Sequence, residues 1–479
     1  MARKAGKKLV LAVIDGLTPG MLERGVEEGR LPALAFLREQ GSYALGTSTF
    51  PSVTPVCLSS IATGAGPDVH GIPHLVWYHA NERRIVEYGS SLAAVFAAGA
   101  RRTLRDSIVE MSRSHLSAEA VTVFESLEDA GLVTAAITFT CYRGRTRHPI
   151  RLAGVASRNR WFEAVNGPRR FFFFNLYESD ATGAPLAIRS RTNGSIDGYA
   201  EAVGRWLVTR DGFDFLVYYL PDYDFAAHVS GPDGATRALE RADGCLGSLF
   251  AAAGGPEQFL DRYAIVVCSD HGQTQVERVT RLEDRFADLR LFTPRRRATP
   301  DRCDVAVCAS NRAALVYRLP GCSLPPRALA ERLDGEPAAD VVLFLEDGLA
   351  VARRGGEELR FVPSDDGWRT EGDRDVLDQT CYPKGLERAW RALACPRAGE
   401  VIVSAALGHE FADLGGRHHA GGGSHGSLSA GDSIVPMLAA GLDSRLSLPS
   451  EPAITDLAPL VLRHFGVDVP PYVEERAHA

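Results

Sequence analysis

The chain has 479 residues, of which 45% are hydrophobic and 24% are charged, and its formal net charge is -7. This composition is ordinary for a globular enzyme, and the acidic balance argues against a protein that coats nucleic acid. The length exceeds what one simple core usually holds, so we expect one large domain with insertions, or two lobes.

The start of the chain predicts neither a signal peptide nor a membrane segment. The apolar run at residues 9–14 is shorter than the roughly 7–15 apolar residues of a signal-peptide core. No run approaches the roughly 20 apolar residues of a membrane helix. The nine cysteines are scattered without a C-x-x-C pair, which is typical of reduced thiols. We therefore expect a cytoplasmic location.

Short apolar runs alternate with amphipathic helical patterns along much of the chain. Helices are expected over residues 199–209 and 235–253. This alternation predicts an α/β fold, a three-layer α/β/α sandwich with a mostly parallel central sheet. The runs that predict buried strands of this sheet are 9–14, 134–139, 171–176, 215–220 and 265–268.

Residues 300–396 follow a different pattern, which we interpret as an inserted α+β cap. Short strands are expected within 305–319 and 341–362. A helix is expected between them, over 326–333. The insertion would be a compact addition to the catalytic domain.

The catalytic core then comprises residues 1–299 and 397–479. The apolar runs 401–407 and 434–440 are expected to return to the main sheet. Residues 454–465 have the pattern of a closing amphipathic helix.

Metal-binding side chains follow two of the predicted strands directly. Asp15 follows the run 9–14, and Asp270 with His271 follows the run 265–268. Ligands of parallel sheets bind at the carboxyl ends of the strands, so these side chains are expected to face one cleft. For Asp15 alone, the alternative is a turn or helix-capping aspartate.

Further candidate ligands lie at a predicted helix and in a glycine-rich loop. Asp224 and His228 are four positions apart, so on a helix they share one face and can reach one metal. The alternative is a solvated charge cluster. His425 lies in a glycine-rich segment, for which the alternative is a flexible surface loop. His418 and His419 are interpreted as loop histidines without a ligand role.

Thr54 is the candidate nucleophile. Pro55 suits the first position of a helix, which would place Thr54 at the N-cap. A hydroxyl there faces unpaired backbone N–H groups and the positive end of the helix, which favours an alkoxide and an incoming phosphoryl group. The alternative is an ordinary threonine cap.

Together these residues can hold two divalent ions. Mixed carboxylate and imidazole ligands suit zinc, with manganese as a competitor. Two such ions about 3.5–4 Å apart would bind both the attacking and the leaving oxygen of an in-line displacement. One ion would be held by Asp224, His228 and His425, and the other by Asp15, Asp270 and His271.

The order of these motifs resembles that of the alkaline phosphatase superfamily, and within it the type I phosphodiesterase/nucleotide pyrophosphatase group. That group has the order Asp, nucleophilic Thr, Asp-x-x-x-His, Asp-His, His. The resemblance implies an alkaline phosphatase-like fold and a covalent threonine nucleophile that is also a metal ligand. The matching residues here are Asp15, Thr54, Asp224, His228, Asp270, His271 and His425.

Two threonines compete for the role of nucleophile. Thr49 is followed by Phe-Pro, as the nucleophile is in phosphodiesterase relatives. In the family, however, the nucleophilic helix ends in Thr-Gly, with the glycine ten positions after the nucleophile. Here that glycine is Gly64, which indicates Thr54. We choose Thr54 and keep Thr49 as the alternative.

One stretch departs from the family pattern. After a His-Gly-Ile segment, the nucleotide pyrophosphatase group carries an asparagine that holds a phosphate oxygen, and here the position falls on Leu75. His74 could replace it as a donor. Arg143 or Arg145 could bind a phosphate bidentately, the alternative being a solvated basic loop.

The resemblance implies metal-dependent hydrolysis of a small phosphate ester or nucleotide through a phospho-threonine. A phosphomonoesterase or a phosphonate hydrolase could use the same two-metal site. Outside enzymes, the alternative is a metal-binding pseudoenzyme.

Overall fold

The computed structural model of the chain describes residues 6–149, 164–173, 177–179, 195–294 and 299–474. Its main sheet has eight strands in the order β2-β22-β11-β1-β10-β5-β8-β9. The five strands from β11 to β8 are parallel, and β2, β22 and β9 join antiparallel at the two edges. The bounds are β1 Lys8–Ile14, β2 Ser42–Thr47, β5 Thr134–Ile137, β8 Arg170–Phe173, β9 Tyr177–Ser179, β10 Phe215–Leu220, β11 Tyr263–Cys268 and β22 Ile434–Ala440.

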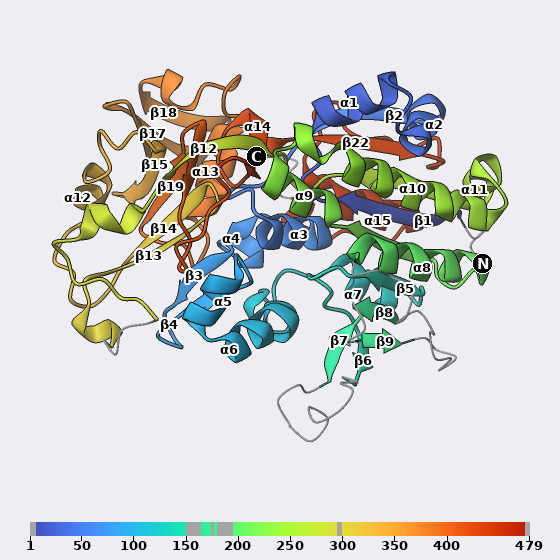
Figure 1. The fold of residues 1–479 in the computed structure, drawn as a ribbon, viewed down its shortest axis with the longest axis horizontal. Helices are drawn as coiled ribbons and strands as arrows, with labels where there is room; N and C mark the ends of the chain where they lie inside the picture. The colour runs from blue at the N-terminus through green and yellow to red at the C-terminus, as the bar shows by residue number, and fades with distance from the viewer. Residues whose placement is uncertain (1–5, 150–163, 174–176, 180–194, 295–298, 475–479) are drawn as a thin grey trace.

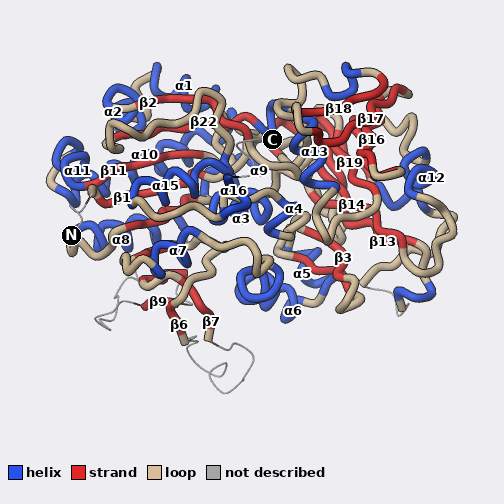
Figure 2. Tube along the Cα trace, turned by 180° about the vertical axis from the view of Figure 1, so that it is seen from behind, coloured by secondary structure: helices blue, strands red, loops and turns tan. Residues whose placement is uncertain are grey.

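Helices cover both faces of this sheet, as Figures 1 and 2 show. Successive side chains of a strand point to opposite faces, so Leu11 and Val13 of β1 join one apolar cluster and Val10 and Ala12 join the other. The sequence prediction of an α/β/α sandwich is confirmed. On the first face lie α3 (Thr54–Thr63), α7 (Val123–Asp129) and α15 (Leu457–Phe465), and on the second α1 (Pro19–Glu27), α2 (Pro32–Gln40), α8 (Ile196–Thr209), α10 (Thr236–Ala253) and α11 (Pro256–Arg262).

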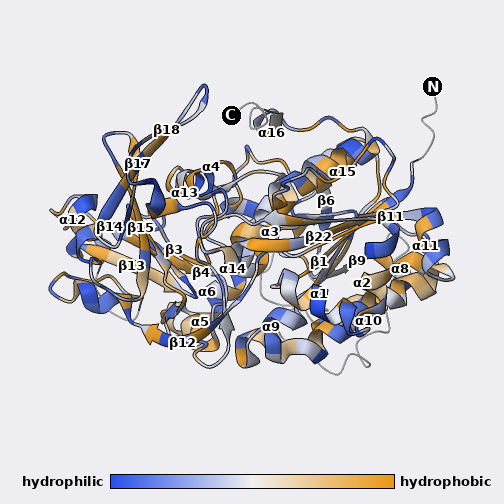
Figure 3. Ribbon diagram, turned by 90° about the horizontal axis from the view of Figure 1, so that it is seen from above, coloured by the Kyte–Doolittle hydropathy of each residue, from blue (hydrophilic) through white to orange (hydrophobic). Residues whose placement is uncertain are grey.

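A second sheet has seven strands in the order β13-β14-β19-β15-β16-β17-β18, all antiparallel. It lies beside the main sheet (Figure 3), and apolar residues of both lobes belong to one continuous cluster, among them Val13 and Leu343. The bounds are β13 Val305–Ser310, β14 Ala313–Arg318, β15 Ala339–Glu346, β16 Leu349–Arg354, β17 Glu357–Ser364, β18 Gly367–Gly372 and β19 Val401–Ala405, with helices α12 (Pro326–Glu331) and α13 (Gly385–Leu393).

The placement of β19 differs from the sequence prediction. We expected residues 401–407 in the main sheet, but β19 pairs with β14 and β15 in the second sheet, so that expectation is wrong. The strand is buried on both faces, since Ile402 joins one apolar cluster and Val403 joins another. A strand buried on both faces reads as an apolar run in either sheet, so composition did not distinguish the two. The expected return of 434–440 is confirmed by β22.

Smaller elements complete the structure. Within the described parts of the chain, no helix combines the length and the apolar character needed to cross a membrane. The remaining strands are β3 (Val76–His79), β4 (Arg84–Glu87), β6 (Thr146–His148), β7 (Val165–Gly167), β12 (Thr274–Thr280), β20 (Gly408–Phe411) and β21 (Gly423–Ser424). The remaining helices are α4 (Pro67–His70), α5 (Leu92–Ala98), α6 (Ala100–Arg105), the π-helix η1 (Asp106–His115), α9 (Asp222–Ser230), α14 (Ala430–Ser433) and α16 (Pro471–Glu474), with 3₁₀ turns at Asp233–Ala235, Leu282–Phe286, Pro300–Arg302, Arg374–Leu377 and Ile454–Asp456.

Candidate metal centre

Three neighbouring strands deliver the acidic residues of the site. Asp15 follows β1, Asp224 lies in the first turn of α9 after β10, and Asp270 follows β11. These strands are adjacent and parallel, so their carboxyl ends meet at one edge of the sheet. The three aspartates are buried, each with at most 5% of its surface exposed.

The structure brings these carboxylates together with histidines in two overlapping groups. Donor atoms of Asp15, Asp270 and His271 all lie within 4.8 Å of one another, as do those of Asp224, His271 and His425. His271 therefore belongs to both groups, whereas the sequence analysis assigned it to one.

His228 lies at the border of the second group. Its Nε2 is 3.2 Å from Asp224 Oδ2, and its ring centroid is 5.1 Å from that of His425.

The three histidines are oriented by backbone carbonyls. When Nδ1–H donates to a carbonyl, Nε2 carries the lone pair and can bind a metal once any hydrogen-bond donor that faces it moves aside. This arrangement repeats at each of the three rings. The pairs are His271 with Gly272 O (3.0 Å), His228 with Gly423 O (2.8 Å) and His425 with Ser52 O (2.8 Å).

The carboxylates fit divalent cations for a complementary reason. Oδ1 of Asp15 and Oδ2 of Asp270 are buried and have no hydrogen-bond partner in the described residues. Burial, together with the charges on Asp270 and Asp224, raises the pKa of Asp15 well above its usual value, and burial also raises the pKa of Asp270. Bound cations would relieve this repulsion and saturate the orphaned oxygens.

Electrostatics within the second group differ from those in the first. Burial alone would raise the pKa of Asp224, but the charge on His228 and its hydrogen bond outweigh burial and hold this pKa well below its usual value. In turn, burial would lower the pKa of His228, but Asp224 raises it. Burial and the charge on His271 lower the pKa of His425, so its imidazole is neutral and can give an electron pair to a metal.

Thr54 lies beside this cluster. Its Oγ1 is 3.2 Å from His271 Nε2. We expected Thr54 at the N-cap, but Val53 has the extended N-cap conformation (φ -116°, ψ 144°) and Thr54 is the first helical residue. Side chains at this position lean toward the start of the helix, which directs the hydroxyl to the cluster.

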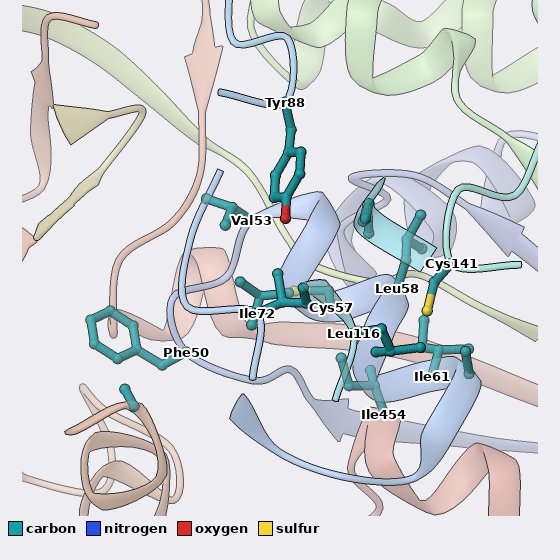
Figure 4. Packing of buried hydrophobic residues seen from close by; sticks show 14 of the residues in the cluster. Phe50, Val53, Cys57, Leu58, Ile61, Ile72, Tyr88, Leu116, Cys141 and Ile454 are labelled. Atoms are coloured by element: carbon teal, nitrogen blue, oxygen red, sulfur yellow. The ribbon is translucent and has the colours of Figure 1, made fainter. Parts of the chain in front are cut away.

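Thr49 is placed differently. Its hydroxyl lies 3.7 Å from Cys57 Sγ and 3.4 Å from Ser60 Oγ, both on α3. It is buried, and within the described residues its hydroxyl makes no hydrogen bond to a candidate metal ligand. Helix α3 is itself buried from Pro55 to Thr63. It packs against an apolar cluster that Figure 4 shows, including Ile72, Leu116, Cys141 and Ile454.

Among the described residues, neither His74 nor Arg143, the two predicted substrate-binding residues, hydrogen-bonds to a residue of the cluster. His74 is fully buried, its Nδ1 lies 3.0 Å from Val76 O, and burial lowers its pKa to about 4. Arg143 donates to Glu125 Oε2 at 3.0 Å and to the carbonyls of Leu116, Ser117 and Ala120. These contacts favour a structural role for Arg143, and substrate binding by either residue stays a prediction.

Several residues that contact the candidate ligands were not singled out in the sequence analysis. The Tyr219 hydroxyl donates to Asp15 Oδ2, and the Gln273 amide donates to Asp224 Oδ1. Asn311, in the turn between β13 and β14, places Nδ2 3.1 Å from His425 Nε2. Of these, only Gln273 had a signal, because it is two positions from His271.

His419 was interpreted as a loop residue, but the structure gives it partners. Its Nδ1 is 2.6 Å from Oε1 of Glu410, a carboxylate with 1% exposure. Its ring stacks on His228 with centroids 4.0 Å apart. The Glu410–His419 pair therefore packs against His228 from outside the cluster. No feature of the sequence had linked Glu410 to His419.

Comparisons with known proteins agree with this arrangement. The family described as type I phosphodiesterase/nucleotide pyrophosphatase matches residues 9–428. No curated protein matches the chain. Among solved structures, phosphonoacetate hydrolase from Sinorhizobium meliloti 1021 in complex with phosphonoformate is similar, at 17% identity and a TM-score of 0.59, covering 97% of this chain and 96% of that one.

Murine ectonucleotide pyrophosphatase/phosphodiesterase 5 is similar at 14% identity, with a TM-score of 0.59 and the same coverage. An inactive threonine-to-alanine variant of that murine protein in complex with AMP is similar at 13% identity, with a TM-score of 0.58. These likenesses confirm the alkaline phosphatase-like fold. Because the family match spans most of its length, the chain belongs to the type I phosphodiesterase/nucleotide pyrophosphatase family and is a phosphoester hydrolase.

Proposed function

We propose that the chain is a two-metal phosphodiesterase/nucleotide pyrophosphatase that works through a covalent intermediate on Thr54. The observation that carries this proposal is the position of Thr54 Oγ1, 3.2 Å from the one histidine shared by both donor groups. The murine relative whose threonine-to-alanine variant is named inactive supports a threonine nucleophile.

The donor set supports a choice of metal and of ligands. Carboxylate and imidazole donors suit Zn²⁺, with Mn²⁺ as the competitor. Bound ions would lower the pKa of the Thr54 hydroxyl and neutralise charge on the phosphoryl group and the leaving oxygen. One ion would be held by Asp15, Asp270 and His271, with Thr54 as a further ligand, and the other by Asp224, His228 and His425.

The reaction is a double displacement. Thr54 Oγ1 loses its proton and attacks phosphorus, the bond from phosphorus to the leaving oxygen breaks, and the leaving group takes up a proton. A water molecule then cleaves the bond between Thr54 and phosphorus and restores the hydroxyl. At the start of α3, Val56 and Cys57 donate their backbone N–H groups to Val53 O and Pro55 has no N–H, so the Thr54 N–H is the backbone donor that this turn can offer a phosphoryl oxygen.

Substrate binding draws on the second lobe. Asn311 reaches the cluster from the β13–β14 turn and carries an amide N–H donor, the kind of group that the family supplies where this chain has Leu75. We assign Asn311 to a phosphoryl oxygen, ahead of His74 and Arg143, because it alone of the three contacts the cluster. In this proposal, residues 300–396 form the cap that selects the substrate, with β19 completing its sheet, and residues 1–299 and the rest of 397–479 form the catalytic core.

Other activities are possible on the same site. The likeness to phosphonoacetate hydrolase favours a phosphonate as the second candidate substrate. A phosphomonoester is the third. The cytoplasmic location remains part of the proposal, supported by nine free cysteines, and localisation of a tagged chain in its host cell tests it.

The test compares bis-p-nitrophenyl phosphate, p-nitrophenyl phosphate and phosphonoacetate with added zinc or manganese, with and without a chelator. Faster, chelator-sensitive hydrolysis of the diester is expected. A preference for the monoester or the phosphonate would replace the substrate class. Absence of all three activities in the metal-loaded protein would contradict the enzyme proposal.

A further inference from the structure

A second group of metal-type side chains lies where the β3–β4 hairpin meets the end of η1. Donor atoms of His79, Glu82 and His115 all lie within 4.8 Å of one another. His79 is the last residue of β3, Glu82 lies in the hairpin turn, and His115 is the last residue of η1. None of these residues belongs to the candidate metal centre.

Glu82 and His79 each keep one free donor atom. Oε2 of Glu82 accepts from Arg84 Nε at 2.6 Å and from Arg102 at 3.1 Å. Its other oxygen, Oε1, faces His79 Nε2 at 3.9 Å. Nδ1 of His79 accepts the backbone N–H of Glu82, so Nε2 is the nitrogen left for a ligand. The arginines therefore hold the carboxylate in place through the oxygen that a metal would not use.

His115 offers the third donor atom, on a buried ring. Only 1% of its surface is exposed, and its Nε2 has no hydrogen-bond partner in the described residues. Its Nδ1 lies 2.8 Å from the Tyr88 hydroxyl, which can hold the ring proton on that side. Burial, followed by the charges on Arg84 and Arg397, lowers the pKa of His115 to about 3, so the ring is neutral.

The local fold also positions both rings. His79 and His115 each contact Trp77, with ring centroids at 5.2 and 5.3 Å. His115 ends a π-helix, a rare conformation that is frequent at functional sites. Asp106 pairs with Arg84, with 2.5 Å between carboxylate oxygen and guanidinium nitrogen, and so offsets one positive charge near Glu82.

We propose that His79, Glu82 and His115 bind a zinc-class divalent cation at this junction. Two imidazole nitrogens and one carboxylate oxygen form a common three-ligand zinc set, with a fourth position for water. Because 39% of the Glu82 side chain is exposed, the ion can enter from solvent. Tyr78, beside His79, contacts the ring of Tyr317 on β14 with centroids 5.8 Å apart, so the ion would stabilise a hairpin that contacts the second lobe.

The test is the zinc content per chain, measured by elemental mass spectrometry after dialysis against limiting zinc. His79→Gln is expected to lower the content by one equivalent relative to the unmodified chain. The matched control is His418→Gln, because His418 is an exposed loop histidine, and no change is expected there. Glu82→Gln serves as the second variant, with an expected loss of at least tenfold in zinc affinity, and circular dichroism checks that each variant folds.

The result must not depend on the candidate metal centre. The comparison is therefore repeated with Asp270→Asn in both chains, and the difference of one equivalent is expected to persist. Equal zinc content in the unmodified, His79→Gln and Glu82→Gln chains would overturn the proposal. Disappearance of the difference in the Asp270→Asn background would also overturn it, since the zinc would then belong to the candidate centre.

Discussion

At the scale of residues, the site depends on how single atoms are oriented. Three histidines use Nδ1 on backbone carbonyls and keep Nε2 for the cluster, while two buried carboxylate oxygens have no donor in the described residues. Positive charge brought to such a cluster stabilises its ionised form, because buried carboxylates repel one another. The proposed metal binding and the proposed catalysis therefore depend on the same arrangement.

Thr54→Ala should lower kcat for the diester by at least about 10³-fold, as expected when a covalent route is lost. Metal content should fall little, because the six carboxylate and imidazole ligands remain. Steady-state kinetics and elemental analysis measure the two quantities. Thr49→Ala is the control, with activity expected to stay within a few-fold of the unmodified chain; the reverse pattern would move the nucleophile to Thr49.

At the scale of elements, the β13–β14 turn joins the second lobe to the site. Arg312 is fully buried and pairs with Asp432 of α14, with 2.6 Å between guanidinium nitrogen and carboxylate oxygen. Its backbone N–H donates to His425 O at 2.9 Å, and Asn311 precedes it. This one turn therefore fixes a proposed ligand and a proposed substrate donor together.

Replacing Arg312 by Met should destabilise the protein by roughly 3–5 kcal/mol, because it leaves a buried carboxylate unpaired. The free energy of unfolding from urea titration measures the effect. Arg445→Met removes an exposed pair with Asp443 and is the control, with no measurable change expected. Equal stability of the two variants would mean that the buried pair does not hold the turn.

Helix α8 carries a buried carboxyl group, Asp197, whose effect on stability can be tested. Burial and the neighbouring charge of Asp222 raise the pKa of Asp197 to about 8. A carboxyl group whose pKa is raised in the folded state stabilises the protein fully below its unfolded pKa of about 4, and this contribution is lost as the pH rises toward 8. Asp197→Asn should therefore flatten the fall in stability over this range, as urea midpoints at several pH values would show. An unchanged slope would indicate that Asp197 is already ionised at pH 4–8.

At the scale of the whole molecule, the two lobes share one apolar cluster, and the site uses residues of both. The main sheet and the meeting of Asp15, Asp224 and Asp270 could be predicted because these aspartates come soon after apolar runs and the carboxyl ends of parallel strands meet. The placement of β19 could not be predicted, because an apolar run indicates a buried strand but not the sheet to which the strand belongs. Asn311 was missed because its approach to His425 depends on a contact between the lobes. Glu410 was missed because nothing in its separation of nine positions from His419 predicts that the two side chains meet.

The central claim is that a phosphorylated Thr54 lies on the reaction path. Bis-p-nitrophenyl phosphate is mixed with the metal-loaded enzyme and quenched with acid within one turnover, and fragmentation mass spectrometry then locates any adduct. A p-nitrophenyl-phosphoryl group is expected on Thr54, with none on Thr49 and none in the Thr54→Ala variant. Full turnover without an adduct on Thr54, or an adduct on another residue, would contradict it.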